Sequence, residues 1–441
     1  MKKIFLNLLA LSSLIAVNAQ ENVYPAAKQT GTVVITNATV HVGNGQVLNN
    51  ASIEIKDGKI TNVSTTPINT SGATIVDATG KHVYPGLILP ASNLGLVETP
   101  SVRATSDVRE IGDLNPNVRS IVAYNTDSKV TNTLRSSGIL IANIVPEGGL
   151  LSGSSSVVQL DAWNWEDAAY KTDAGLHFNM PSLLPSFGGF GGGSGGPGGP
   201  NAQQSDPVKR GLEQVDRIKS FFREAKAYTS TKDNDETNLK FSAVKGLFDK
   251  SKKLYVHANT VKQMLVALDF VREFGMDVVI VGGSDSWQIA DLLKQNNVSV
   301  ILNQPHSLPT AGDDDVDQPY KTPALLQKAG VTFAINDDDG QTRGRNLSYN
   351  AGTASAYGLT KEQALQAITL NAAKVLGIAD KTGSIEVGKD ANIVISTGDI
   401  LDMRTSTVTD AFIQGRKIDL NDKQKQLNDR YKFKYGIKSP F

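Results

Sequence analysis

Short apolar runs separated by turn-forming residues predict strands at both ends of the chain. Residues 32–35 and 51–55 are two such runs, and the second continues through Asp57-Gly58 into a further strand. An Asp-Gly pair between alternating strands predicts a two-residue hairpin, because both turn positions require positive φ. The same β pattern returns over residues 383–395 and 408–418. The two ends of the chain therefore predict one small antiparallel sheet domain to which both termini contribute.

Between these ends, apolar runs alternate with amphipathic helical patterns, which is typical of βα units around a parallel sheet. The predicted strands cover residues 139–145, 156–160, 254–257, 277–281, 298–302 and 331–335. The predicted helices cover residues 261–274, 287–295, 323–328 and 361–376, and a charged amphipathic helix covers residues 206–228. Glycine dominates residues 186–204, which we interpret as a flexible linker or an exposed flap.

Composition and the N-terminal residues bear on location and partners. Lysine plus arginine and aspartate plus glutamate both number 44, so charge favours neither nucleic acid nor an anionic membrane as a partner. Lys2 and Lys3 precede an apolar run over residues 4–17, which predicts a signal peptide of residues 1–19 cleaved after Ala19. The run is shorter than the roughly 20 apolar residues of a spanning helix. We expect a periplasmic or secreted protein, held together without disulfides because the 441 residues include no cysteine.

A Pro-Gly pair leads an apolar run over residues 84–93 that ends in small and turn-forming residues. This segment resembles the first barrel strand of the amidohydrolase superfamily, in which a Pro-Gly-hydrophobic strand ends in Asp-x-His-x-His. In that family the two histidines share one face of the strand and bind a catalytic divalent metal. Aligned without a gap, Leu89 replaces the aspartate, and Ala91 and Asn93 replace the histidines. The run over residues 383–394 also resembles the family's returning strand.

The resemblance implies an α/β fold: a TIM-like (β/α)8 barrel plus a small β-sandwich domain formed by both termini. The implied parts are residues 20–80 and 381–420 for the sandwich, 81–380 for the barrel and 421–441 for a C-terminal tail. The imidazolonepropionase-like branch is the most similar. That branch implies hydrolysis of carbon–nitrogen bonds other than peptide bonds.

Three further positions follow from the resemblance. His257 ends a predicted strand in a Val-His-Ala context that resembles a metal-ligand position of the family, although a histidine at a strand end can equally be structural. Gly282 stands where the next strand should end in another histidine. Asp338 fits the terminal aspartate that acts as general base and metal ligand, with Asp337 and Asp339 as competitors. Three adjacent carboxylates could also form a solvated turn.

The number of histidines bears on the metal. The chain has five, at positions 41, 82, 177, 257 and 306, and only His257 occupies a position that the family uses for a ligand. A catalytic zinc site needs about three protein ligands, and His257 with Asp338 supplies two. We therefore expect no tightly held cofactor. Zinc or another divalent metal would bind only if the family site is retained in altered form.

We expect Asn93, His257 and Asp338 to converge at the barrel mouth, because functional groups gather at the C-terminal ends of barrel strands. Such a set suits recognition of a small polar ligand. Two hypotheses follow: a hydrolase with weakened or altered metal use, with Asp338 as its catalytic residue, or a non-catalytic relative. The second would bind a ligand or pair with an active paralogous amidohydrolase, and a homo-oligomer is also compatible with the sequence.

Overall fold

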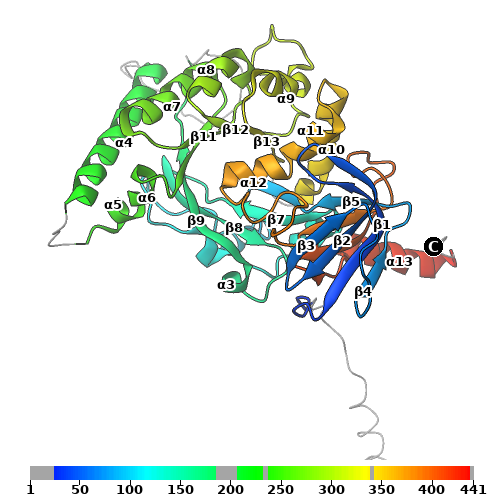
Figure 1. Cartoon of the computed structure of the whole chain (residues 1–441). Coiled ribbons are helices and arrows are strands. Elements are labelled where there is room, and N and C mark those ends of the chain that lie inside the picture. The colour runs from blue at the N-terminus through cyan, green and yellow to red at the C-terminus, as the bar shows by residue number, and fades with distance from the viewer. Residues whose placement is uncertain (1–23, 185–205, 232–236, 338–341, 438–441) are drawn as a thin grey trace, which may run out of the picture.

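A computed structural model describes residues 24–184, 206–231, 237–337 and 342–437. It has two parts, a β-barrel surrounded by helices and a second sheet beside it that contains strands from both ends of the chain (Figure 1). The predicted barrel beside a sheet from both termini is confirmed. The predicted signal peptide, the glycine-rich segment and Asp338 with Asp339 lie outside the described residues.

The terminal sheet joins the two ends of the chain in the order β16-β15-β14-β5-β1-β2-β3, with β4 paired to β1. Its central contact is antiparallel and pairs β14 with β5, which brings residues 393–396 beside residues 82–85. The sheet has its own buried cluster of β-branched and other apolar side chains. Its strands are β1 (Thr32–His41), β2 (Val47–Lys56), β3 (Lys59–Ser64), β4 (Thr74–Asp77), β5 (His82–Pro85), β14 (Ile393–Ser396), β15 (Val408–Ile413) and β16 (Arg416–Lys417).

The hairpin predicted at Asp57-Gly58 joins β2 to β3. Asp57 has φ 51° and Gly58 has φ 79°, so both turn residues lie in the left-handed region. This is the backbone conformation for which Asp-Gly is favoured in two-residue hairpins.

The barrel sheet contains eight strands in sequence order from β6 to β13. Seven of them run in one direction, whereas β8 is antiparallel to both β7 and β9. The connections on either side of β8 are short, and a parallel pair requires a crossover of a dozen or more residues. Here two hairpins therefore replace parallel βα units. The strands are β6 (Leu87–Ser92), β7 (Ile139–Ile144), β8 (Leu151–Gln159), β9 (Ala169–Asn179), β10 (Lys253–Ala258), β11 (Val278–Gly282), β12 (Ser299–Leu302) and β13 (Phe333–Ile335).

The first and last barrel strands are joined by side-chain and helix contacts. The backbone N–H of Ala91 donates to Oδ1 of Asn336 at 3.1 Å, and that of Ile88 donates to the carbonyl oxygen of Ile368 at 2.9 Å. Helix α12 (Leu370–Leu376) packs against the inward-facing apolar residues of the strands. Its carbonyl at Val375 accepts a hydrogen bond from the Tyr255 hydroxyl at 3.2 Å, so α12 closes the N-terminal end of the barrel.

The remaining helices surround the barrel, and α7, α8 and α9 lie together on one side of it (Figure 1). Residues 361–376 form two helices, α11 and α12, where the sequence predicts one. The helices are α2 (Lys129–Ser136), α3 (Trp165–Ala168), α4 (Pro207–Ser230), α5 (Leu239–Ala243), α6 (Lys245–Phe248), α7 (Val261–Phe274), α8 (Ala290–Gln295), α9 (Gln318–Ala329), α10 (Leu347–Ala356), α11 (Lys361–Ala367), α13 (Lys423–Tyr435) and the short 3-10 turns η1 (Arg103–Thr105), η2 (Ser120–Ala123), η3 (Ser286–Ile289) and η4 (Thr342–Asn346).

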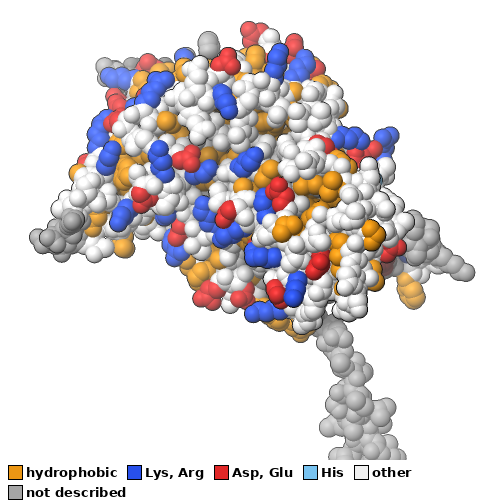
Figure 2. Space-filling model, viewed as in Figure 1, with side chains coloured by type: hydrophobic (Ala, Val, Ile, Leu, Met, Phe, Trp, Pro, Cys, Tyr) orange, Lys and Arg blue, Asp and Glu red, His pale blue; other side chains and the backbone are white. Residues whose placement is uncertain are grey.

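Among the described residues, no helix combines the length and the apolar composition that crossing a bilayer requires. Figure 2 shows positive and negative side chains interspersed over the visible face.

Candidate functional site

The C-terminal ends of the barrel strands surround a cavity of about 260 Å³, here called the mouth cavity. Asparagines from five different strand ends line it. Asn93 follows β6, Asn179 ends β9, Asn259 follows β10, Asn303 follows β12 and Asn336 follows β13. Parallel strands bring their C-terminal ends to one edge of a barrel, which is why residues so far apart in sequence meet.

The structure brings two of the predicted site residues together, because Asn93 and His257 both line the mouth cavity. Asp338 lies outside the described residues, so its side chain is not placed. Its neighbour Asp337 is buried and accepts a hydrogen bond from Nδ2 of Asn350 at 3.1 Å. Ala91 and Gly282 also line the cavity, and neither has a side chain that could bind a metal.

His257 is paired with a second histidine. Its Nε2 lies 2.9 Å from Nδ1 of His177 on β9, whose ring stacks on Tyr255 with centroids 4.8 Å apart. Burial lowers the pKa of His257 to about 4. Burial and the neighbouring His257 hold the pKa of His177 well below its usual range. Both rings are therefore neutral at pH 7.

The direction of this hydrogen bond follows from the surroundings of His177. Nε2 of His177 is buried and has no hydrogen-bond partner among the described residues. If Nδ1 of His177 carries the proton and donates to His257, the unpaired nitrogen is an acceptor. The other tautomer would bury an unpaired N–H, which native structures avoid more strictly. His257 accordingly accepts at Nε2 and carries its own proton on Nδ1.

Three asparagine side chains donate hydrogen bonds from their amide nitrogens to the protein. Nδ2 of Asn93 donates to the Glu147 carboxylate at 3.0 Å, and Nδ2 of Asn179 donates to the carbonyl oxygen of Gly149 at 2.9 Å. Below them, Nδ2 of Asn143 donates to the carbonyl oxygen of Pro90 at 3.1 Å. All three partners can only accept, so the orientation of each amide is fixed. The Oδ1 atoms of these side chains are the ends turned away from those bonds.

The side chains around the mouth cavity are poor ligands for a divalent metal. Amides predominate around the mouth cavity, and zinc prefers imidazole, thiolate and carboxylate ligands. The lone pair on Nε2 of His257 already accepts a bond from His177. Among the residues described, no group of three or more histidine, cysteine, aspartate or glutamate side chains is arranged to hold a metal ion.

The sequence reasoning missed His177, Asn143 and Asn179. His177 and Asn179 lie on β9, which was not predicted as a strand. A period-two signal was present, because apolar Leu176 and Phe178 alternate with polar His177 and Asn179. β9 directly precedes β10 in the barrel and ends in Asn179, so an amide side chain stands at the end of the strand next to His257.

Comparison with known proteins identifies relatives of the chain. The amidohydrolase family model matches residues 243–418. An imidazolonepropionase from Flavobacterium johnsoniae is 35% identical over 81 residues, which is 18% of this chain and 20% of that protein. The amidohydrolase tasK of Hapsidospora irregularis is 22% identical over 369 residues, which is 76% of this chain and 36% of that protein. The match to the imidazolonepropionase thus spans about a fifth of its length.

A solved structure extends the likeness to nearly the whole fold. The crystal structure of an amidohydrolase from Thermotoga maritima superposes with a TM-score of 0.75 at 25% sequence identity. The superposition covers 88% of this chain and 99% of the other. The barrel with its sheet from both termini, the matched family region and this superposition together make the chain similar to the amidohydrolase superfamily, including its imidazolonepropionase-like members.

Proposed function

We propose that the protein binds a small polar ligand at the mouth cavity and does not hydrolyse it. One observation supports this most directly. The positions where the family resemblance implies imidazole ligands hold Ala91, Asn93 and Gly282, and the remaining imidazole, His257, is hydrogen-bonded to His177. Without a metal, nothing lowers the pKa of an attacking water towards about 7, so hydroxide would not form there at neutral pH.

The second candidate is hydrolysis of a carbon–nitrogen bond other than a peptide bond. Similarity to the amidohydrolase family favours it, together with a barrel of eight strands that follow one another in sequence order. In this case Asp338 would act as general base, a role that rests on sequence resemblance alone. A metal would have to be held by His257 and Asp338 in an altered form of the family site.

Metal content and turnover distinguish these functions. Protein purified without chelator should contain well under one zinc per chain. A zinc site needs roughly three protein ligands, and the described residues around the cavity supply fewer. A panel of cyclic amides and dipeptides, assayed with and without added zinc, should show binding without turnover. Asp338→Ala should weaken binding and leave the negligible hydrolysis rate unchanged. The matched control is Asp402→Asn, since Asp402 pairs with the exposed Arg404 away from the cavity.

Two results would restore the hydrolase. One is a tightly bound equivalent of a transition metal that is lost in His257→Ala. The other is turnover of any panel member that disappears in Asp338→Ala but survives in Asp402→Asn.

We also propose that the protein is exported, because residues 1–19 have the features of a signal peptide. A homo-oligomer or a complex with an active paralogous amidohydrolase would be compatible with a non-catalytic barrel. Fractionation of cells and sizing of the purified protein test these two proposals.

A further inference from the structure

The charge of the groups around the mouth cavity restricts the ligand. Among the residues that the structure describes, neither lysine nor arginine lines the cavity, and Glu147 is its one charged side chain. His257 is neutral at pH 7 for the reason given above. A carboxylate or phosphate in the cavity would therefore meet one carboxylate and no compensating cation.

The hydrogen-bonding groups that line the mouth cavity also restrict the ligand. Asn93 donates one of its two N–H groups to Glu147, and Asn179 donates to protein acceptors, so the carbonyl end of each side chain is turned away from its protein partner. Asn179 uses Nδ2 fully, on Gly149 and on Oγ of Ser152, both at 2.9 Å. Asn336 has the opposite orientation, because its Oδ1 accepts the backbone N–H of Ala91. Asn93 and Asn179 thus turn their carbonyl oxygens, and Asn336 its N–H groups, away from these protein partners.

Below the mouth cavity, three buried polar atoms have no partner among the described residues: Oδ1 of Asn143, Oγ of Ser155 and Nε2 of His177. They lie on the adjacent strands β7, β8 and β9. They share the inner face of the barrel, since Asn143 is opposite Val157 and Ser155 is opposite Gly175, two residues before His177. All three residues are fully buried. An unsatisfied buried polar atom costs about 1–3 kcal/mol, so this layer calls for a water or a ligand group that donates hydrogen bonds.

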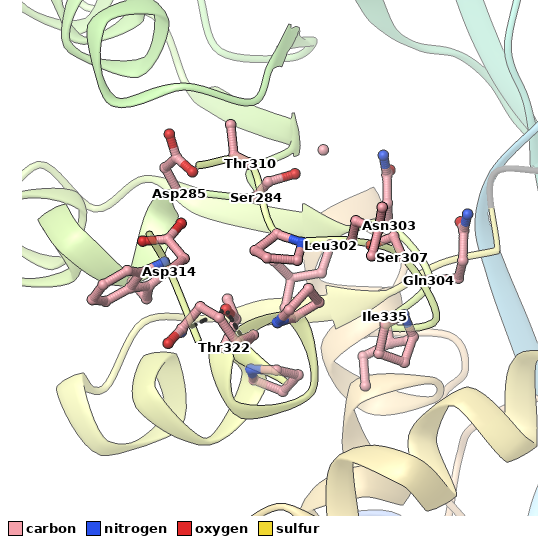
Figure 3. A pocket seen from close by; sticks show the side chains of 18 residues that line it. Ser284, Asp285, Leu302, Asn303, Gln304, Ser307, Thr310, Asp314, Thr322 and Ile335 are labelled. Carbon is pink, nitrogen blue, oxygen red and sulfur yellow. Dashed lines mark hydrogen bonds between the residues drawn. The ribbon is translucent and has the colours of Figure 1, made fainter. Parts of the chain in front are cut away.

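A smaller cavity of about 40 Å³, here called the annex, adjoins the mouth cavity, and Gly282 and Asn303 line both. Figure 3 shows Asp285 and Asp314 at one end of the annex and Asn303 with Gln304 at the other, while Leu302 lies between them. Trp287 and four prolines also line the annex: Pro305, Pro309, Pro319 and Pro323. Its charged groups are again acidic, and its size suits a small apolar group.

We propose that the mouth cavity selects a ligand bearing an ammonium or carboxamide N–H donor with a small apolar group, and rejects carboxylates. This rests on the proposed function, because it assumes that the mouth cavity is the binding site. The ammonium or amide N–H would face Glu147 and the carbonyl end of Asn179, and the apolar group would lie toward the annex.

Three leucine derivatives of similar size test the proposal by calorimetry at pH 7. Leucinamide is cationic, N-acetylleucinamide is neutral and N-acetylleucine is anionic. The first two should bind, and the third should bind at least about tenfold more weakly, because its carboxylate meets Glu147 and no cation. Glu147→Gln should weaken leucinamide about tenfold and change N-acetylleucinamide less than about threefold, since only the cation loses an opposite charge. Glu147 is exposed, so this variant should fold, and Asp402→Asn is the remote control.

Three results would contradict the proposal. Equal binding of N-acetylleucine overturns the charge selection and leaves polar-ligand binding at the mouth intact. An equal effect of Glu147→Gln on the cationic and neutral ligands removes Glu147 as the selecting group. Failure of all three compounds to bind overturns this ligand class, whereas the proposed function is decided separately by the cyclic amide and dipeptide panel.

Discussion

Asp161 is the centre of a buried ionic cluster that joins distant parts of the chain. Its Oδ1 lies 2.5 Å from Nη1 of Arg135, and its Oδ2 lies 2.8 Å from Nη1 of Arg416. Oδ2 also accepts the backbone N–H of Ala26 at 2.9 Å. Only 1% of the Asp161 side chain is exposed. One carboxylate thus connects the N-terminal segment, α2 and β16.

Asp161→Ala should lower the free energy of unfolding by about 3–5 kcal/mol, because it leaves two largely buried guanidinium groups without their counter-charge. Urea unfolding followed by circular dichroism measures this loss. Asp402→Ala is the control, since its partner Arg404 is 88% exposed and such a surface pair contributes less than about 1 kcal/mol. Equal losses in the two variants would show that the buried cluster does not stabilise the fold.

A second residue cluster lies where the terminal sheet meets α11. Nδ1 of His41 is 2.7 Å from Oε1 of Glu362, and its Nε2 is 3.0 Å from Nδ1 of His82. Burial, followed by the nearby His41 and Lys361, lowers the pKa of His82, while Asp399 acts in the opposite direction. In the unfolded chain a histidine titrates near 6.5.

Acidification should therefore destabilise the protein at His82. Below about pH 6.5 the unfolded chain takes up a proton that the folded chain does not yet bind, so the free energy of unfolding falls as the pH falls. The melting temperature should drop less between pH 7.5 and 5.5 in His82→Asn than in the wild type. The exposed His306 provides the control His306→Asn, which should keep the wild-type pH dependence. The same drop in all three proteins would assign the acid sensitivity to other groups.

At the residue scale, the sequence located candidate site residues where a recognisable motif could be aligned. The alignment of residues 84–93 predicted Asn93 near His257, and both line the mouth cavity. The motif could not identify His177 as a site residue. Its role arises from its hydrogen bond to His257 on the neighbouring strand β10. The role of Asp338 stays a prediction.

Among the elements, the pairing of β14 with β5 is the contact through which the C-terminal strands complete the sheet. Four residue pairs, from Ile393 opposite Pro85 to Ser396 opposite His82, form this ladder. β5 in turn pairs with β1, whose other neighbour in the sheet order is β2. Removal of β14 would expose the edge of β5 and part of the buried cluster of the sheet.

Deletion of residues 384–441 should therefore remove hydrogen-exchange protection from β1 to β5, because the sheet loses three strands and apolar contacts from Ile393, Ile395 and Phe412. Deletion of residues 423–441 is the matched control. It removes α13, in which no side chain is buried, so protection in the sheet should persist. Normal protection of the N-terminal strands in the longer deletion would mean that they fold without the C-terminal strands.

Element prediction succeeded where the pattern was local and failed where tertiary contacts decide. The Asp57-Gly58 hairpin needs only its own two residues. The division between α11 and α12 depends on the carbonyl of Ile368, which accepts a hydrogen bond from Ile88 of β6 instead of continuing the helix. β9 was missed because half of its central residues are polar and face a polar layer inside the barrel.

For the whole molecule, the barrel is closed at one end and open at the other. α12 fills the N-terminal end with apolar contacts, and the C-terminal end opens into the mouth cavity. The sequence predicted this polarity through the rule that barrel function lies at the strand C-termini. The orientation of the asparagine amides around the mouth could not be predicted, because it depends on partners such as Glu147 and Gly149.

The reversed strand β8 also bears on how quickly the barrel can assemble. β7, β8 and β9 form a meander whose partners are close in sequence, whereas β9 and β10 are separated by more than seventy residues that include α4. The entropy lost on closing a loop rises with its length, and local contacts speed folding. The meander can thus form early and offer β9 as a template on which β10 pairs after the longer segment has collapsed. In this view the reversed strand gives the barrel a starting point for folding at the side where His177 and Asn179 line the interior.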